Sequence, residues 1–179
     1  MPAEIDRAVR VPISHPARNV FRAVLTWELC VMNFHDIAPV LEPILIEALR
    51  LTQSEKGNIQ VFDGSSGCLT IEAHHGFDDN FLEAFKSVSA ANGCACGRAI
   101  RSRVPIVIAD VLLDDEYAPY RQAAMEAGFR SVVSLPLIAR GSIVGVISIH
   151  RASPGTGEPD VEALRGVAEF AAEAISRHR

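Results

Sequence analysis

The stretch 131-SVVSLPLIARGSIVGVISIH-150 decides the fold that the chain is expected to adopt. Residues 131–137 and 143–150 are apolar runs rich in β-branched side chains, which favour strands over helices. The string IARGS between them is typical of a hairpin turn. We therefore predict an antiparallel β-hairpin here and assign the neighbouring elements outward from it.

The segments directly before this hairpin alternate between helix and strand. The string 119-PYRQAAMEAG-128 predicts a helix that opens on Pro119 and stops at Gly128, because these residue types are common at helix ends. Further upstream, 98-RAIRSR-103 has a helical composition, and residues 104–109 predict a short apolar strand. The string 110-DVLLDDEY-117 predicts a polar connection.

A second hairpin is predicted in the first half of the chain. Residues 58–62 and 68–74 have the alternation of strands, and the turn-rich string 63-DGSSG-67 joins them. The string 77-FDDNFLEAFKSV-88 then predicts a short helix that begins at Asp78 or Asp79.

Two apolar stretches precede this hairpin. Residues 16–34 fit a helix better than a strand. In the next stretch, 35-HDIAPVLEPILIEALRLTQ-53, Asp36 is a candidate helix cap and Pro39 is acceptable in a first turn. Pro43 lies deeper, where a proline removes a hydrogen bond and clashes with the preceding turn. We expect either a kink at Pro43 or a helix that begins close to it.

The closing segment, 158-EPDVEALRGVAEFAAEAISRHR-179, predicts a helix with two apolar stripes. The first stripe comprises Val161, Leu164, Ala168, Ala171 and Ile175. The second stripe comprises Val167, Phe170 and Ala174. One stripe can face the sheet, so the other needs a second helix or another subunit as its partner. We therefore take Val167, Phe170 and Ala174 as the candidate dimer interface.

The order of elements mixes antiparallel strand pairs with terminal helices, which is typical of the α+β class. A length of 179 residues favours one domain. We place it at residues 36–179 and treat residues 1–35 as an N-terminal extension with a helix.

Composition and charge exclude several classes of protein. A net charge of −5 argues against a general nucleic-acid binder, which needs a concentrated basic surface. No uncharged apolar run reaches the roughly eighteen residues of a membrane span. The four cysteines are too few for a disulfide framework and indicate a reducing cytoplasm.

Several strings resemble the GAF domain, a ligand-sensing module of signalling proteins. They are 57-GNIQVFD-63, 75-HGF-77, 96-CGRAIRSRVPIVIADV-111, 119-PYRQAAMEAGFRSVVSLPL-137 and 143-IVGVISIH-150. The resemblance implies an antiparallel sheet of about six strands, with terminal helices on one face that often dimerise. It also implies a ligand pocket on the opposite face, under loops and short helices. The expected partners are a second copy and a signalling protein such as a histidine kinase.

Cys94 and Cys96 in 93-GCACG-97 raise the question of a redox or metal site. A zinc site needs about four ligands, and His74 and His75 do not supply a suitably spaced second pair. A disulfide between residues two apart would close a strained ring. The simpler interpretation is that small residues are needed where the chain turns from a loop into a helix.

Some small GAF proteins are free methionine-(R)-sulfoxide reductases, and their Val-Cys-Gly step resembles 95-ACG-97, so Cys96 matches that cysteine. That chemistry also needs an attacking thiolate close to a resolving partner. In the family the attacking cysteine precedes the Pro-Leu strand, but residues 112–129 contain no cysteine here. The Cys-His dipeptide typical of bilin attachment is absent as well. We expect no cofactor.

The resemblance places a lid at residues 114–122, over the strand at 131–137. Tyr117, Tyr120 and Arg121 of this lid are expected to converge with Ser134 and Cys96 on a small molecule. The remaining candidate ligand residue is His150, at the end of its strand, where a histidine is either a pocket ligand or a surface side chain.

The first hypothesis is a non-enzymatic regulatory domain that binds a small molecule of unknown identity and signals through a helical dimer or a partner. The second is a thiol redox enzyme of the free methionine-(R)-sulfoxide reductase type that uses Cys94 and Cys96. The third is a structural dimerisation module whose pocket is filled by its own side chains.

Overall fold

The computed structural model describes residues 36–179, so the helix predicted over residues 16–34 lies outside the described residues. The described chain forms one antiparallel sheet of six strands in the order β3-β2-β1-β6-β5-β4. The strands are β1 Lys56–Asp63, β2 Cys68–His75, β3 Val88–Ser89, β4 Ile106–Ile108, β5 Ser131–Ala139 and β6 Ser142–Arg151. The helices are α2 Ala38–Thr52, α3 Asp79–Ala84, α4 Ala95–Ser102, η1 Ala118–Tyr120, α5 Arg121–Glu126 and α6 Glu158–His178. The predicted α+β class and sheet are confirmed, although the two-residue strand β3 was not predicted.

The β5–β6 hairpin has a tighter turn than the sequence suggested. Ala139 pairs with Ser142, so only Arg140 and Gly141 lie outside the ladder. Both have positive φ, 51° and 78°, which is the backbone of a type I′ turn. Glycine adopts this conformation without steric cost. The five-residue turn predicted at IARGS is therefore wrong, because Ile138 and Ala139 continue β5.

Pro136 lies inside β5, where a proline would normally disrupt a ladder. The neighbouring strand β4 pairs only with Val132, Val133 and Ser134. Beyond Ser134, β5 has no strand on that side. Pro136 therefore lies on an open edge of the sheet, where the missing N–H removes no hydrogen bond to β4.

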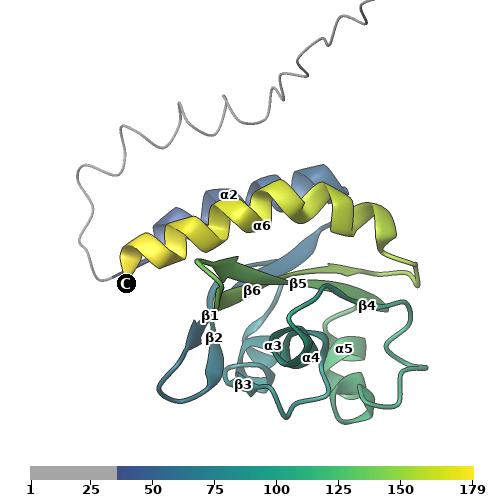
Figure 1. Ribbon diagram of the computed structural model, residues 1–179. Coiled ribbons are helices and arrows are strands. Elements are labelled where there is room, and N and C mark those ends of the chain that lie inside the picture. Colours follow the sequence, from purple (N-terminus) through teal and green to yellow (C-terminus); the bar gives the residue numbers. More distant parts are fainter. Residues whose placement is uncertain (1–35) are drawn as a thin grey trace, which may run out of the picture. The chain divides into compact units, whose positions relative to one another are not determined.

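Helices cover both faces of the sheet (Figure 1). The long helices α2 and α6 lie together on one face, and α3, α4 and α5 lie with their connecting loops on the other. Each face has its own apolar core. The core under α2 and α6 includes Leu45, Ile147 and Leu164, whereas the opposite core includes Phe81, Phe129 and Tyr117. Burial on both faces explains why the strands are so apolar.

Helix α2 runs through Pro43, so the alternative of a helix that begins close to this residue is wrong. The helix begins at Ala38 with Pro39 in its first turn. The N-cap position is Ile37 rather than the expected Asp36, although the Asp36 carboxylate accepts a hydrogen bond from the Ala38 N–H at 3.0 Å.

Both apolar stripes of α6 have partners within the chain. Leu164, Ala171 and Ile175 are buried in the core against the sheet and α2. Val167 belongs to the same core and is only 4% exposed, so the prediction that it forms a dimer interface is wrong. The second helix that this stripe needed is α2. Phe170 and Ala174 are half-buried against the same core.

Gly145 and Gly166 provide opposite tests of this packing. A Cβ at Gly145 would lie 2.3 Å from the Gln60 carbonyl oxygen, so Gly145→Ala forces β1 and β6 apart. We expect it to lower the free energy of unfolding by about 1–3 kcal/mol. Gly166 is an exposed residue of α6 with nothing near a Cβ, so Gly166→Ala should raise that energy by up to about 1 kcal/mol. Urea unfolding measures both changes, and equal effects would contradict the packing described.

Candidate functional site

The central strands place a row of polar side chains on the sheet face opposite α2 and α6. Asn58 of β1 pairs with Ser148 of β6, and Ser148 pairs with Ser134 of β5. Since side chains alternate between faces along a strand, Gln60 lies on the face of Asn58 and His150 on that of Ser148. All five side chains are buried. The two serine hydroxyls hydrogen-bond each other at 2.7 Å.

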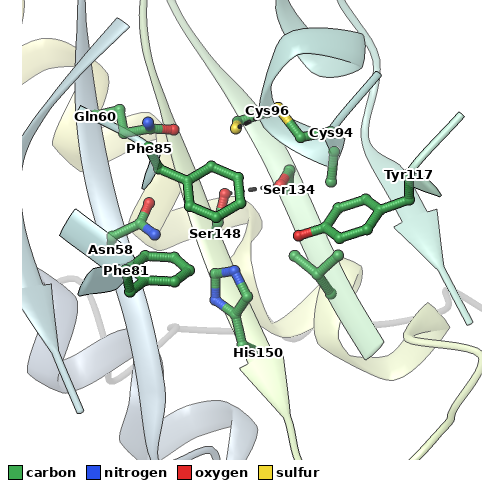
Figure 2. Close-up of a pocket in the computed structure, with 12 residues that line it drawn as sticks. Asn58, Gln60, Phe81, Phe85, Cys94, Cys96, Tyr117, Ser134, Ser148 and His150 are labelled. Carbon is green, nitrogen blue, oxygen red and sulfur yellow. Dashed lines mark hydrogen bonds between the residues drawn. The ribbon is translucent and has the colours of Figure 1, made fainter. Parts of the chain in front are cut away.

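These polar side chains line a small cavity of about 10 Å³, which is about the space that one water needs. Phe81 and Phe85 flank the cavity on one side and Tyr117 flanks it on the other, as Figure 2 shows. Cys94 and Cys96 lie at one end. The cavity therefore has a polar floor on the sheet and walls of aromatic rings and thiols.

Three buried polar atoms on this floor lack a hydrogen-bond partner among residues 36–179. They are Asn58 Oδ1, Gln60 Oε1 and His150 Nδ1. Burial of a polar group without a hydrogen bond costs on the order of 1–3 kcal/mol. Three such atoms together destabilise the folded chain. A bound molecule that supplied the missing hydrogen bonds would remove this cost.

His150 is enclosed by aromatic rings. The centroids of Phe77 and Phe129 lie 5.0 and 4.6 Å from the imidazole, both in edge-on arrangements. Burial, with a smaller contribution from the charge of Lys56, lowers the pKa of His150 to about 3. The imidazole is therefore neutral at physiological pH and can both donate and accept a hydrogen bond.

Cys94 and Cys96 lie at the start of α4, with their Sγ atoms 3.4 Å apart. The hydrogen bond from Cys96 lowers the pKa of the Cys94 thiol. The same contact, together with burial, raises the pKa of Cys96. Both cysteines are buried and neither forms a disulfide. Their proximity permits thiol chemistry, but their access to solvent is small.

The flanking glycines explain why small residues are needed here. A Cβ at Gly93 would lie 2.2 Å from the Glu116 carbonyl oxygen, and one at Gly97 would lie 2.5 Å from the Asn92 carbonyl oxygen. Backbone segments thus pack directly against the start of α4, and no larger residue fits. The prediction that 93-GCACG-97 supplies small residues at a loop-to-helix transition is confirmed for both glycines.

Asp114 anchors the lid, residues 114–122, over the cavity. Its carboxylate accepts hydrogen bonds from Arg98 of α4 at 2.9 and 2.8 Å and from the Tyr117 N–H at 3.0 Å. The Asp114 carbonyl accepts a further hydrogen bond from Arg121 at 3.0 Å. The Tyr117 side chain is thereby held in the cavity wall, where burial raises its pKa well above the usual range.

The structure brings together four of the six predicted ligand residues. Cys96, Tyr117, Ser134 and His150 line the cavity, and His150 is buried rather than at the surface.

Tyr120 and Arg121 lie outside this lining. The Tyr120 hydroxyl accepts a hydrogen bond from Asn92 at 2.6 Å. The guanidinium of Arg121 bonds the carbonyl oxygens of Val111 and Asp114. Both side chains hold the lid in place instead of facing the cavity.

Asn58, Gln60 and Ser148 line the cavity, and the sequence analysis did not select them. The sequence contains a pattern that could have identified two of them, because Asn58 and Gln60 alternate with the apolar Ile59 and Val61 in 57-GNIQVFD-63. Alternation normally indicates a strand with one face in solvent. In a sheet covered on both faces, it indicates polar groups inside the protein.

Within residues 36–179, no three His, Cys, Asp or Glu side chains lie close enough together to hold a metal ion. No helix in the same residues is long and apolar enough to cross a membrane.

The GAF domain family model matches residues 35–176, which is most of the chain. The chain belongs to the GAF domain family. No curated protein sequence matches it. The matched residues include every strand of the sheet and the whole lining of the cavity, so the candidate site is a feature of the GAF domain itself.

Solved structures share this GAF fold at low sequence identity. A GAF domain of a phosphoenolpyruvate-protein phosphotransferase from Coxiella burnetii has a TM-score of 0.70 and 17% identity, covering 91% of this chain and 96% of that one. The GAF domain/HD domain protein of Geobacter sulfurreducens gives 0.67 and 16%, covering 81% and 95%. A free methionine-R-sulfoxide reductase from Neisseria meningitidis gives 0.69 and 17%, covering 96% and 97%.

The buried His150 should make stability depend on pH. The unfolded imidazole takes up a proton near its ordinary value of 6.5, whereas the folded one stays neutral down to about 3. The unfolded state therefore binds more protons in this window, so the stability is complete above about pH 6.5 and falls as the pH is lowered. From about pH 7.5 to about pH 5 we expect a loss of about 2 kcal/mol in the free energy of unfolding, measured with urea.

The matched variants are His150→Gln and His74→Gln. Since glutamine does not titrate, His150→Gln should remove this part of the pH dependence. His74 is exposed on β2, so His74→Gln should leave the dependence unchanged. The same slope in wild type and His150→Gln would contradict the assignment to His150.

Proposed function

We propose that this GAF domain is a non-enzymatic regulatory domain of a signalling protein. It binds a small molecule in the cavity between β1, β5, β6 and the lid. The observation that carries the proposal is the cluster of Asn58 Oδ1, Gln60 Oε1 and His150 Nδ1, buried without partners among the described residues. A ligand that supplies hydrogen bonds would recover the free energy lost by burying them. The remaining lining is aromatic and apolar, as in most ligand pockets.

Strand β6 supplies a route from the cavity to the terminal helices. His150 and Arg151 are consecutive, so their side chains point to opposite sheet faces. Arg151 donates hydrogen bonds to the Asp160 carboxylate of α6 at 2.8 and 2.6 Å, and also to the Thr52 carbonyl at the end of α2. A ligand that displaces His150 would move the residue that holds both helices. Such a movement transmits a signal if α2 and α6 have two arrangements and the ligand binds them with different affinity.

The α2–α6 layer is the proposed output surface. Ile46 of α2 is 50% exposed, and Phe170 and Ala174 lie half-buried on α6. On this proposal a second copy or a signalling partner, such as a histidine kinase in the cytoplasm, contacts the two helices. The phosphotransferase that contains the similar Coxiella domain supports a regulatory setting.

Native mass spectrometry tests ligand binding and subunit number together. Wild-type protein, purified directly or incubated with a protein-free metabolite extract, should retain a small molecule. Ser148→Leu should lose it, because the added bulk enters the cavity. Ser142→Leu makes the same change at an exposed position of β6 and should keep it. Wild-type protein with no retained mass after either treatment counts against a sensor, and a monomer at every concentration counts against the dimer.

A second candidate function is a thiol redox enzyme, favoured by the 3.4 Å between Cys94 Sγ and Cys96 Sγ. In such a reaction the two thiols give up two electrons and two protons to a sulfoxide. The oxygen leaves as water, and the thiols form an S–S bond of about 2 Å. The fold similarity to the Neisseria reductase suggests free methionine-R-sulfoxide as the substrate. Against this, both thiols are buried and residues 112–129 contain no further cysteine.

Cys96→Ser separates the two candidate functions. We expect wild type and Cys96→Ser to show the same background rate of free methionine-R-sulfoxide reduction with dithiothreitol as the reductant. Cys68→Ser, outside the cavity lining, is the matched control. Turnover by wild type that persists in Cys68→Ser and disappears in Cys96→Ser would select the redox enzyme instead.

A further inference from the structure

The lining of the cavity offers no counter-charge to an ionic ligand, and the Lys56 ammonium, outside this lining, donates to the Gly76 carbonyl at 2.5 Å. Among the described residues that line it, none is Lys, Arg, Asp or Glu. Arg98 and Arg121, which come from the surrounding elements, direct their guanidinium groups to Asp114. His150 is neutral at physiological pH because its pKa is lowered to about 3. Burial of an unpaired charge is far more costly than burial of a polar group that forms a hydrogen bond. The lining therefore favours an uncharged ligand.

The residues that carry the three unpartnered polar atoms are spread along the floor of the cavity. Gln60 lies opposite Val146, and His150 lies four residues further along the same strand, which is about 13 Å at about 3.3 Å per residue. Figure 2 shows Gln60 and His150 at opposite ends of the cavity, with Asn58 between them. A water bridges only partners that lie within about 3 Å of it. A molecule with hydrogen-bonding groups at more than one point is needed to satisfy all three.

The groups on the floor also define the hydrogen bonds that the ligand must make. The side chains of Asn58 and Gln60 each combine a carbonyl acceptor with N–H donors, and a neutral imidazole has one nitrogen of each kind. An amide or ureide group, with N–H and C=O in one plane, is complementary to such partners. The rings of Phe81, Phe85 and Tyr117 bound the cavity on both sides and favour a flat molecule.

We propose that this cavity binds a small, uncharged, planar molecule that bears amide or ureide N–H and C=O groups. Asn58 and Gln60 hydrogen-bond one part of it, His150 bonds the other end, and the aromatic rings enclose its faces. This inference rests on the proposed function, because it identifies the ligand class of that same cavity.

Phe81 provides the way in. It lines both the cavity and a groove of about 250 Å³ between α3 and α5. Its side chain is 3% exposed and separates the two spaces. On this proposal Phe81 rotates to join them, which gives room for a ring that the 10 Å³ cavity alone does not hold, while Phe85 and Tyr117 remain beside the ligand. This opening leaves the bonds between Arg98 and Asp114 of the lid in place.

The test compares four probes of similar size against the full chain, by titration monitored with two-dimensional ¹H–¹⁵N NMR. Benzamide is neutral and carries the amide group, benzoate is an anion, benzamidine is a cation, and toluene has no hydrogen-bonding group. We expect saturable shifts in β1 and β6 with benzamide. The other probes should bind at least about tenfold more weakly, because each loses either charge neutrality or hydrogen bonds.

Gln60→Met gives a second, distinctive readout. It replaces an unpartnered buried amide with an apolar side chain of similar shape, so the melting temperature should rise by about 3 °C. The same variant should weaken benzamide binding by about tenfold. Gln53→Met makes the identical change at an exposed position at the end of α2 and should alter neither quantity. Asn58→Leu is the alternative variant if Gln60→Met does not fold.

The outcomes separate this inference from the proposed function. Tighter binding of benzoate, benzamidine or toluene in the same strands overturns the ligand class and leaves the cavity as a ligand site. Absence of saturable benzamide binding also overturns the class. In that case the proposed function still stands if native mass spectrometry finds a small molecule that wild type retains and Ser148→Leu loses. A lower melting temperature in Gln60→Met would identify a site for ordered water and overturn the inference.

Discussion

The central sheet is covered on both faces, and this constraint determines where polar side chains are buried. On the side of α2 and α6, Ile59, Ile147 and Ile149 interlock with helix side chains in an apolar core. On the other side, the alternate positions carry polar groups such as Asn58 and Ser148, which are equally buried. A polar group enclosed in this way must find a hydrogen bond inside the fold or in a bound molecule. The face under α2 and α6 therefore contributes stability alone, whereas the opposite face combines an apolar core with the candidate site.

The walls of the cavity differ in how firmly they are held. The lid is tied to α4 through the Asp114–Arg98 ion pair, whose side chains are 21% and 19% exposed. Helix α3 is only six residues long, and its start is fixed by the Asp78 carboxylate, which accepts a hydrogen bond from the Phe81 N–H at 3.1 Å. Short elements with few buried hydrogen bonds unfold locally at a lower free energy than the sheet does. Movement that admits a ligand is therefore more favourable at α3 than at the lid.

Much of the fold was predictable because its signals are local. The β5–β6 hairpin, the helix start at Asp78 and the loop-to-helix transition at Gly93 follow from strand propensity, helix capping and the need for small residues. The site residues were harder to predict than the fold, because the direction of a lid side chain depends on turns that leave no periodic pattern in the sequence. Tyr117 was correctly expected at the cavity, whereas Arg121 bonds the lid backbone. Gln60 was overlooked because a polar residue in an alternating strand normally faces solvent.

The packing of both α6 stripes within the chain, with Phe170 and Ala174 half-buried, restricts the output surface of the proposed function. Val167 packs within the chain, so an interface with another molecule must use the outer surfaces of α2 and α6 together. On the proposed function, the relative position of these two helices is the quantity that a partner senses. Arg151 bonds both of them from the strand that carries His150. Packed helices shift as units and do not deform continuously. A displacement at the cavity that is shorter than a side chain can therefore alter the α2–α6 surface.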